Sequence, residues 1–209
     1  MRNIILKIVD KFAFFFSFFF SYPIFKYFKF FKNRVYSFSV KRNFAKCGSN
    51  FYIEAPIYLH GASNISIGDN FFCFESLRLE AFKKHQGNEY NPNIKIGNNV
   101  SINYNCHIGC SNSITIEDNV LIASNVFITD HFHGDTNYID KKIPRERKLI
   151  SKGPVYISEN VWIGENVVVL PNVTIGRNTI VGANSVVTKS FPENTIIGGN
   201  PAKIIKKLE

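Results

Sequence analysis

The sequence predicts an all-β parallel solenoid preceded by a helical segment of aromatic and basic residues. Three observations lead to this prediction. An aliphatic residue recurs every six positions, an asparagine recurs three positions after it, and the first 46 residues differ sharply in composition from the rest. A period of six fits neither the helical period of 3.6 nor the alternation of a two-sided strand. A short, fixed repeat of this kind is typical of a solenoid.

Two phases of the repeat are expected to face inward. One is aliphatic, and a smaller side chain follows it four positions later. Two inward side chains in six residues indicate one short strand with one buried face. The aliphatic positions are Ile96, Ile102, Ile108, Ile116, Ile122, Ile128, Ile157, Ile163, Val169, Ile175, Val181 and Val187. The smaller side chains are Val100, Cys106, Val120, Val126, Val161, Val167, Val173, Thr179 and Ser185.

The asparagine phase predicts the corners of the coil. Asparagine is the non-glycine residue that best tolerates a positive φ, so each one marks a sharp bend between two strands. Three strands and three corners make a triangular coil, and coils stack by strand pairing about 4.8 Å apart. The nine residues at this phase are Asn99, Asn105, Asn119, Asn125, Asn160, Asn166, Asn172, Asn178 and Asn184.

Several breaks in the repeat set the predicted domain boundaries. The register slips by two residues between Ile108 and Ile116, and a long loop occupies residues 129–154. A weaker form of the repeat places the start of the solenoid near residue 50, in a domain that begins at residue 47, and residues 71–86 are expected to form a distorted coil. The repeat stops after Val187, and residues 191–209 are expected to close the domain, which therefore spans 47–209.

Residues 1–46 form a separate basic segment. They contain ten Lys or Arg, a single acid and 13 of the 21 phenylalanines, whereas the remaining residues carry no net charge. A nucleic-acid partner is not expected, because the domain itself lacks a basic excess. The longest uncharged run, Phe12–Phe25, would cover about 21 Å as a helix, short of the roughly 30 Å of a bilayer core. Peripheral contact with an anionic membrane is predicted. The alternative is an arm that packs on the domain or on a neighbouring subunit.

The four cysteines form no CxxC pair and no pattern of metal ligands. A reduced, cytoplasmic protein without a metal is therefore expected, at the inner face of the cytoplasmic membrane if the basic segment binds lipid. Cys106 and Cys110 lie within the repeat, and Cys106 is at an inward position, so both are expected to pack rather than to act as nucleophiles.

Three phrases resemble the hexapeptide-repeat acyltransferases: Val161–Gly176, Ile180–Pro192 and Gly198–Lys207. The resemblance covers about residues 50–209. It implies a left-handed β-helix that assembles as a homotrimer and uses acetyl-CoA as acyl donor. The stretch Val120–Asp135 is similar to the subgroup that O-acetylates lipopolysaccharide, O-antigen or capsule sugars. This implies a glycan or lipid-linked sugar as the acceptor.

Acyl transfer to a hydroxyl requires a general base, and His131 and His133 are the candidates. An imidazole with an ordinary pKa near 6.5 suits this role at neutral pH. Two residues apart in an extended chain, both rings face the same side, so geometry does not separate them. The spacing in related galactoside and maltose acetyltransferases implies His133, counted seven residues after Val126. His131 or Asp130 would then orient it.

Two further residues are candidates for contacts with the reacting groups. Trp162 is the only tryptophan and is expected to point out of the solenoid, where its indole N–H could meet the reacting carbonyl. An aromatic residue at a coenzyme or subunit interface is the alternative. The resemblance implies that Asn103 contacts the acceptor.

The resemblance also implies the coenzyme site. Ala183 would meet the pantetheine arm with its backbone, and Thr188 and Lys189 would continue that contact. Lys203 and Lys206 match basic positions near the coenzyme phosphates. Glu165 departs from the small residue that relatives often have there.

Other functions remain open at this level. One is acetyl transfer to a small free sugar, an antibiotic or the amine of a nucleotide-sugar. A zinc enzyme of the carbonic-anhydrase type would need three histidines, and His107 with His131 and His133 imitates that set without the family spacing. A non-catalytic scaffold is the third alternative, although the loop at residues 129–154 argues against it.

Overall fold

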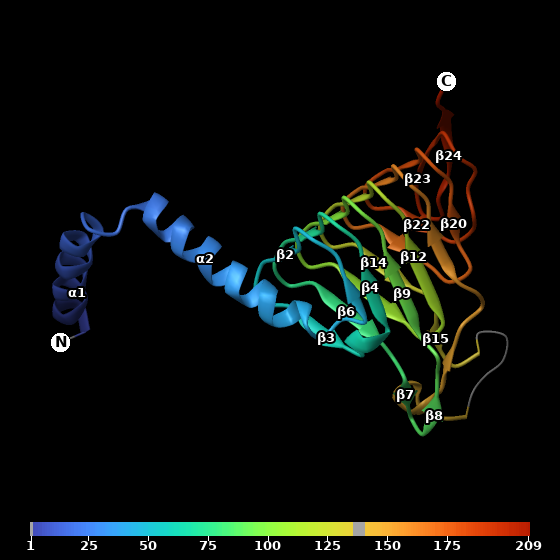
Figure 1. Ribbon diagram of the computed structural model, residues 1–209, viewed down its shortest axis with the longest axis horizontal. Helices are drawn as coiled ribbons and strands as arrows, with labels where there is room; N and C mark the ends of the chain where they lie inside the picture. Colours follow the sequence, from blue (N-terminus) through green and yellow to red (C-terminus); the bar gives the residue numbers. More distant parts are fainter. Residues whose placement is uncertain (1, 136–140) are drawn as a thin grey trace.

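Residues 2–135 and 141–209 are described by a computed structural model, in which two helices precede a three-sided solenoid of short parallel strands (Figure 1). Successive strands belong to three sheets in turn, so the chain returns to each sheet once per coil. Sheet A contains β1 (Lys46–Cys47), β4 (Ile65–Ile67), β9 (Asn93–Ile96), β12 (Ser113–Ile116), β17 (Val155–Ile157) and β20 (Thr174–Ile175). Sheet B contains β2 (Tyr52–Ile53), β5 (Phe72–Cys73), β10 (Ser101–Ile102), β13 (Leu121–Ile122), β18 (Trp162–Ile163), β21 (Ile180–Val181), β23 (Thr195–Gly198) and β24 (Lys203–Lys207). Sheet C contains β3 (Tyr58–His60), β6 (Arg78–Ala81), β11 (His107–Cys110), β14 (Phe127–Thr129), β19 (Val168–Val169) and β22 (Val186–Val187).

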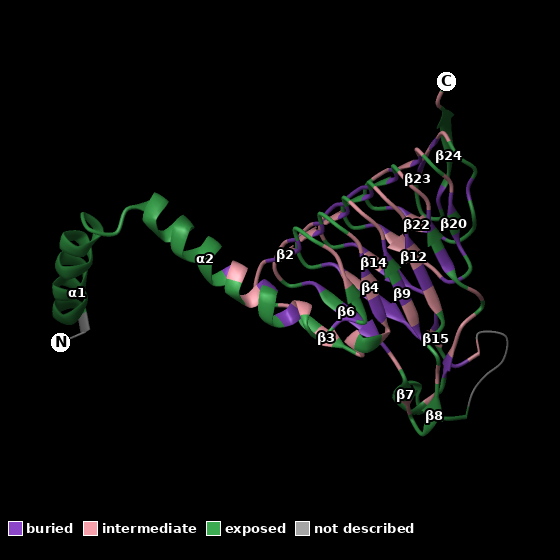
Figure 2. Cartoon of the chain, viewed as in Figure 1, coloured by how far each residue is buried: buried purple, intermediate pink, exposed green. Residues whose placement is uncertain are grey.

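The core of the solenoid is formed by the inward positions that the repeat predicts. All twelve aliphatic positions are at most 4% exposed, and the nine smaller side chains are buried with them. Figure 2 shows this burial running along the inside of the stacked coils. Because every coil adds its side chains to the same column, the core is continuous along the solenoid.

The corners are also as predicted. All nine asparagines at the corner phase have a positive φ, between 54° and 63°. Along one edge the side-chain amides hydrogen-bond from coil to coil, with Asn119 between Asn99 (2.9 Å) and Asn160 (3.1 Å). The same ladder includes Asn50, Asn70, Asn178 and Asn194. Asparagine therefore supplies both the bend and a polar link between neighbouring coils.

The expectation of a distorted coil at residues 71–86 is wrong for most of that segment. β5 and β6 pair in regular parallel register with their neighbours, and the coil is intact as far as Ala81. Phe71 and Leu77 fill inward positions that hold smaller residues in later coils, which hides the repeat in the sequence. The true excursion follows, as a hairpin of β7 (Lys84–His85) and β8 (Asn88–Glu89).

The second excursion is the loop predicted at residues 129–154. It contains β15 (Phe132–His133) paired antiparallel with β16 (Leu149–Ile150), and a short 3-10 helix, Pro144–Glu146. Residues 136–140 of this loop lie outside the described residues. The two excursions contact each other, since the Leu149 N–H donates to the Tyr90 hydroxyl at 2.9 Å and the Gln86 amide donates to the Arg145 carbonyl at 2.9 Å.

The two ends of the solenoid are covered differently. At the C-terminal end, β24 folds back antiparallel on β23, as expected for a closing element. At the N-terminal end, the helix α2 (Tyr22–Lys41) packs against β2, and α1 (Arg2–Ser17) stands apart from the solenoid (Figure 1). Both helices confirm that the basic segment is helical. Within the described residues, neither has the length and apolarity that a membrane span requires.

Polar side chains of α2 cap the open edge of the first coil. The Ser37 hydroxyl accepts a hydrogen bond from the Ile53 N–H at 2.8 Å, and the side-chain Oδ1 of Asn33 accepts one from the Ala55 N–H at 3.3 Å. Both side chains are buried. A sheet edge whose N–H groups have no partner is otherwise prone to unwanted pairing, so the polar face of α2 satisfies the end of the solenoid.

We expect Asn119→Ala to lower the free energy of unfolding by about 2 kcal/mol, and Asn119→Gly by roughly 1 kcal/mol less. Both variants lose the amide ladder, but only alanine is strained at a φ of 60°. Chemical denaturation measures the difference. Asn98, whose φ is not positive, is the matched control, and there the glycine variant should be the less stable one. The same order at both positions would contradict the corner argument.

Candidate active site

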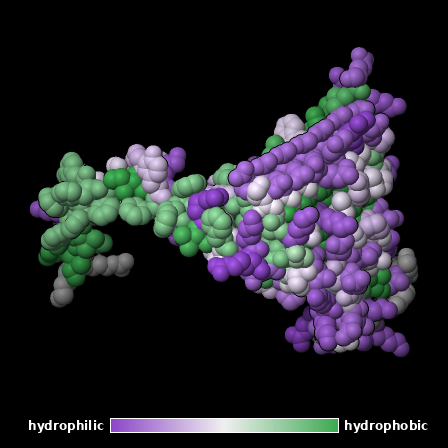
Figure 3. Space-filling model, in the orientation of Figure 1, coloured by the Kyte–Doolittle hydropathy of each residue, from purple (hydrophilic) through white to green (hydrophobic). Residues whose placement is uncertain are grey.

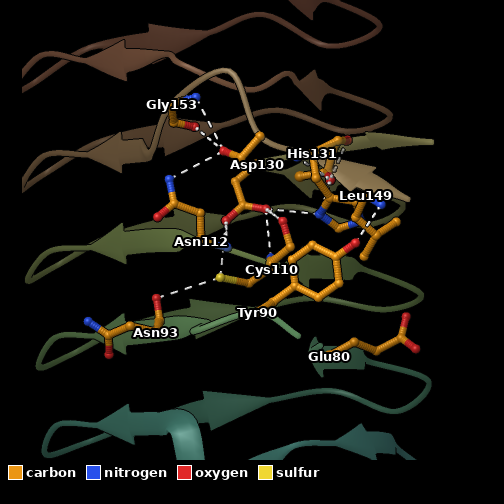
Figure 4. A network of polar contacts seen from close by, with 12 residues as sticks. Glu80, Tyr90, Asn93, Cys110, Asn112, Asp130, His131, Leu149 and Gly153 are labelled. Carbon is orange, nitrogen blue, oxygen red and sulfur yellow. Dashed lines mark hydrogen bonds and ion pairs between the residues drawn. The ribbon is translucent and has the colours of Figure 1, made fainter. Parts of the chain in front are cut away.

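The loop that leaves sheet C after β14 begins with a buried carboxylate–histidine pair, Asp130 and His131 (Figure 4). Oδ1 of Asp130 lies 2.9 Å from Nδ1 of His131, and the Thr129 hydroxyl lies 3.3 Å from the same nitrogen. A carboxylate at Nδ1 favours the tautomer with its proton there. Nε2 is then left as the proton acceptor.

A corner of the neighbouring coil fixes the Asp130 carboxylate. The Ser111 N–H donates to Oδ1 at 2.8 Å, the Asn112 N–H donates to Oδ2 at 2.7 Å, and the Cys110 thiol donates to Oδ2 at 3.2 Å. Ser111 and Asn112 lie between β11 and β12, where the sequence register slips by two residues. The extra residues thus provide two adjacent N–H groups, which form a small anion-binding concavity.

The pKa of Asp130 lies below its usual range. Burial by itself raises it, but hydrogen bonds from His131, Ser111 and Asn112 outweigh burial. The carboxyl group is therefore ionised at neutral pH. In that state it can orient the imidazole of His131 and stabilise its protonated form.

His131 and His133 line the same small pocket on the outer side of sheet C, as their spacing predicts. Their ring centroids are 6.4 Å apart. The Phe82 ring meets the His131 ring edge-on, with the two ring centroids 5.4 Å apart. The ring centroids of His85 and His133 are also 5.4 Å apart. Burial lowers the pKa of His133, and the two neighbouring histidines lower it further, so this ring is neutral at pH 7.

A second carboxylate–histidine pair forms another wall of this pocket. Oε2 of the buried Glu80 lies 2.9 Å from Nε2 of His107 and 2.5 Å from Nε of Arg78. Burial lowers the pKa of His107, with Arg78 acting in the same direction. Gly109 separates the two pairs, because a Cβ there would stand 3.3 Å from His107 Nε2 and 3.5 Å from His131 Cε1. Glycine at this position keeps the pocket open.

The predicted residues Asn103, Trp162 and Ala183 do not meet the histidines within one chain. Trp162 is on β18 of sheet B and is 49% exposed, so it does point outward as expected. Asn103 follows β10 and Ala183 follows β21, both also in sheet B. The histidine pocket opens on sheet C instead. One chain therefore presents two separate groups of candidate residues.

The predicted coenzyme residues beyond Ala183 lie nearer the C-terminal end. Thr188 and Lys189 follow β22 and are exposed. In sheet C, Ile128 pairs with Val169, and Val169 pairs with Val187. The residues after Val187 therefore lie two coils beyond Thr129. Lys203 and Lys206 are exposed on β24. These lysines place positive charge at the C-terminal end of the solenoid.

The cysteines do not offer a nucleophile. Burial raises the pKa of Cys106 to about 11 and that of Cys110 still further. The reactive form of cysteine is the thiolate, which is scarce at such pKa values. Across the described parts of the chain, no three His, Cys, Asp or Glu side chains are arranged as metal ligands.

Sequence reasoning did not identify Arg78, Glu80 and Phe82 as parts of the pocket, nor His85 as the neighbour of His133. The signal that could have found Glu80 is the register of β6, which places it beside Gly109 of β11. That register was hidden because the coil at residues 71–81 has unusually large inward residues. Phe82 and His85 belong to the first excursion, whose position next to the second one follows from tertiary contacts alone.

Comparisons with known proteins agree with this architecture. Residues 154–189 match the bacterial transferase hexapeptide family (six repeats), and residues 93–130 match the hexapeptide repeat of succinyl-transferase. A curated protein of Escherichia coli (strain K12), described as the putative lipopolysaccharide biosynthesis O-acetyl transferase WbbJ, is 44% identical over 159 residues. The match covers 74% of this chain and 78% of that protein. The chain belongs to the hexapeptide-repeat acyltransferase family. The predicted family is thereby confirmed, and with it the prediction of a transferase.

Solved structures of other hexapeptide-repeat acyltransferases have the same overall form. A hexapeptide-repeat containing acetyltransferase from Vibrio cholerae, solved with acetyl coenzyme A, is 29% identical with a TM-score of 0.53. It matches over 81% of this chain and 74% of its own. AntD, an N-acyltransferase from Bacillus cereus solved with dTDP and coenzyme A, is 23% identical with a TM-score of 0.67, covering 82% of this chain and 88% of its own. At that identity, AntD supports the fold alone.

We expect Asp130→Asn to weaken the dependence of stability on acid pH. The native pKa of Asp130 lies below its unfolded value of about 3.9, so its ionised form stabilises the fold above that pH. This contribution is lost as the pH falls through the native pKa. Between about pH 6 and pH 3, the wild type should therefore lose more free energy of unfolding than Asp130→Asn does.

Denaturant titrations at several pH values provide this measurement. Asp10→Asn, at an exposed position of α1, is the control and should follow the wild type. Equal losses in the wild type and in Asp130→Asn would show that the buried pair does not stabilise the ionised carboxyl.

Proposed function

We propose that this acyltransferase moves an acetyl group from acetyl-CoA to a hydroxyl group of a bacterial cell-envelope glycan. The observation that supports it most directly is the buried Asp130–His131 pair, whose imidazole lines a pocket on the solenoid surface. The acetyl donor is supported by the Vibrio cholerae acetyltransferase solved with acetyl coenzyme A. The acceptor class is supported by the relative described as a lipopolysaccharide biosynthesis O-acetyl transferase.

His131 is proposed as the general base. Its Nδ1 is engaged by Asp130, and its Nε2 remains to accept the acceptor hydroxyl proton. The hydroxyl oxygen then attacks the thioester carbonyl carbon. When the tetrahedral oxyanion collapses, the carbon–sulfur bond breaks and His131 returns the proton to the departing thiolate. No covalent enzyme intermediate is required.

The choice between His131 and His133 rests on hydrogen bonding. Spacing in related enzymes implies His133, but the carboxylate of Asp130 contacts His131. An imidazole held by a carboxylate loses less freedom in the reaction, and the carboxylate stabilises the positive charge that the ring acquires. His133, between His131 and His85, would then contact the acceptor at the mouth of the pocket.

A homotrimer of left-handed coils is part of this proposal, since both are properties of the family. Two observations on the single chain support assembly. Trp162 lies on sheet B, and Asn103 and Ala183 follow strands of that sheet, whereas the histidine pocket is on sheet C. Sheet B also presents Leu121 and Trp162, both exposed and paired in register, on its outer surface. A neighbouring copy that brings its sheet B to this pocket would complete the site with the indole N–H of Trp162 and the coenzyme contacts. A catalytically active monomer would contradict this.

The central test is release of free thiol from acetyl-CoA, with and without an envelope glycan extract. We expect glycan-dependent release by the wild type and a loss of about 100-fold or more in His131→Ala. Asp130→Asn should lose at least about tenfold, because the imidazole loses its orienting charge. His133→Ala should retain kcat more fully and raise the KM for the acceptor.

Two outcomes would change the assignment. If His133→Ala abolishes turnover while His131→Ala retains it, the base is His133. If acetyl-CoA is consumed with a free sugar or with a nucleotide-sugar amine but not with the glycan extract, the acceptor proposal is wrong and the transfer chemistry stands. Binding of acetyl-CoA by each variant, measured by calorimetry, distinguishes lost chemistry from lost folding.

Glu80→Gln is expected to raise the KM for the acceptor about tenfold with a smaller effect on kcat. The substitution removes the charge that bonds His107 and Arg78, so this wall of the pocket loses its fixed arrangement. The KM for acetyl-CoA should change little. Glu89→Gln, in the exposed hairpin, is the matched control. An equal rise in both KM values for Glu80→Gln would indicate a general loss of structure instead.

A further inference from the structure

The helix α1 has one apolar and one polar side, and both are exposed. Successive residues turn by about 100° around a helix, which gathers Ile4, Ile5, Ile8, Phe12, Phe15 and Phe16 on one side. Each of these six side chains is more than half exposed. Asn3, Lys7 and Asp10 lie on the other side, together with the apolar Leu6 and Phe14, and Lys11 lies at the boundary between the two sides. Figure 3 shows this apolar surface standing clear of the solenoid.

The helix α2 packs on the first coil with a mixed side, in which the apolar Val40 is buried together with polar residues. Its polar residues Asn33 and Ser37 are buried against the first coil. An apolar stripe faces away from the solenoid, at the helical spacing of three, four and seven residues. It consists of Ile24, Tyr27, Phe28, Phe31, Val35 and Phe38, all exposed. Covering the solenoid edge requires only the side of α2 that carries Asn33, Ser37 and Val40, so folding gives no reason for this stripe.

The charge of the segment indicates what covers these apolar surfaces. Lys7 lies on the polar side of α1 and Lys11 at its edge, and Lys32 and Arg34 flank the stripe of α2. Asp10 is the only acid among residues 1–46. An amphipathic helix with cations on its polar side and aromatic residues on its apolar side lies well in the headgroup layer of an anionic bilayer.

We infer that α1 and the outer stripe of α2 bind the surface of an anionic lipid bilayer and hold the solenoid beside it. A second copy of this chain is the less favourable occupant, because it would bring the same cations together without acids to balance them. The polar side of α1 suits a helix that lies along the surface, with its apolar side toward the acyl chains. This inference does not depend on the proposed acetyl transfer.

Vesicle flotation of the full-length protein tests the inference. We expect the protein to float with vesicles in which about a third of the lipid is phosphatidylglycerol, and at least about tenfold less with pure phosphatidylcholine. Raising the salt from about 0.1 M to about 1 M shortens the Debye length from about 10 Å to about 3 Å and should release much of the bound protein.

Two variants separate the apolar and the electrostatic parts. The triple variant Phe28→Ser, Phe31→Ser and Val35→Ser should lower binding to anionic vesicles about tenfold or more. Ile143→Ser, an exposed apolar position in the second excursion, is its control. Lys7→Glu with Lys11→Glu should reduce binding to anionic vesicles to the level of neutral ones. Lys95→Glu with Lys207→Glu, on exposed positions of the solenoid, should not.

Absence of flotation of the wild type with anionic vesicles would overturn the inference. So would a triple variant that floats like the wild type but sediments as a smaller assembly, since the stripe would then be a contact between copies. Sedimentation velocity of each variant supplies that comparison. A loss of flotation with unchanged assembly size supports the bilayer as the partner.

Discussion

The solenoid depends on one conformational constraint, a left-handed residue at each regular corner of the coil. A residue of ordinary type held at a positive φ costs about 1–2 kcal/mol, so a solenoid with many corners needs residues that avoid this cost. Asparagine does so at nine regularly spaced positions and also links neighbouring coils through its amide. The strands are too short to be stable alone. They persist because the corners return the chain to the same register, where each coil extends three sheets and one core at once.

The candidate active site arises where this regularity fails. A regular coil has no spare N–H groups, since each pairs with the next coil. The two additional residues at Ser111 and Asn112 free a pair of N–H groups, and these hold the carboxylate of Asp130. The adjacent excursions then place Phe82 against the ring of His131 and His85 against the ring of His133. The regular coils thus hold the candidate site in place, while the residues that depart from the repeat supply its functional groups.

The sequence predicted the fold well because its signals are local and repeated. Aliphatic and asparagine phases recur in nearly every coil, and the structure confirms both. It predicted the site less completely. Glu80 was missed because Phe71 and Leu77 conceal the register of its coil. The two histidines could not be distinguished, because the partner of Asp130 depends on a corner nearly twenty residues earlier in the chain. Contacts of that kind depend on tertiary stacking, which a pattern within one strand does not encode.

The N-terminal helices extend the same reasoning to the edge of the solenoid. The first coil has no preceding coil to accept its N–H groups, so α2 must offer oxygen atoms there, and Ser37 and Asn33 do so. The side of α2 that faces away from the solenoid takes no part in this capping, so its residues reflect the environment outside the protein. Selection for solubility alone would favour polar residues at those positions. The outer stripe of α2 is instead apolar and flanked by cations, which makes a lipid surface the environment that reconciles its sequence with its position.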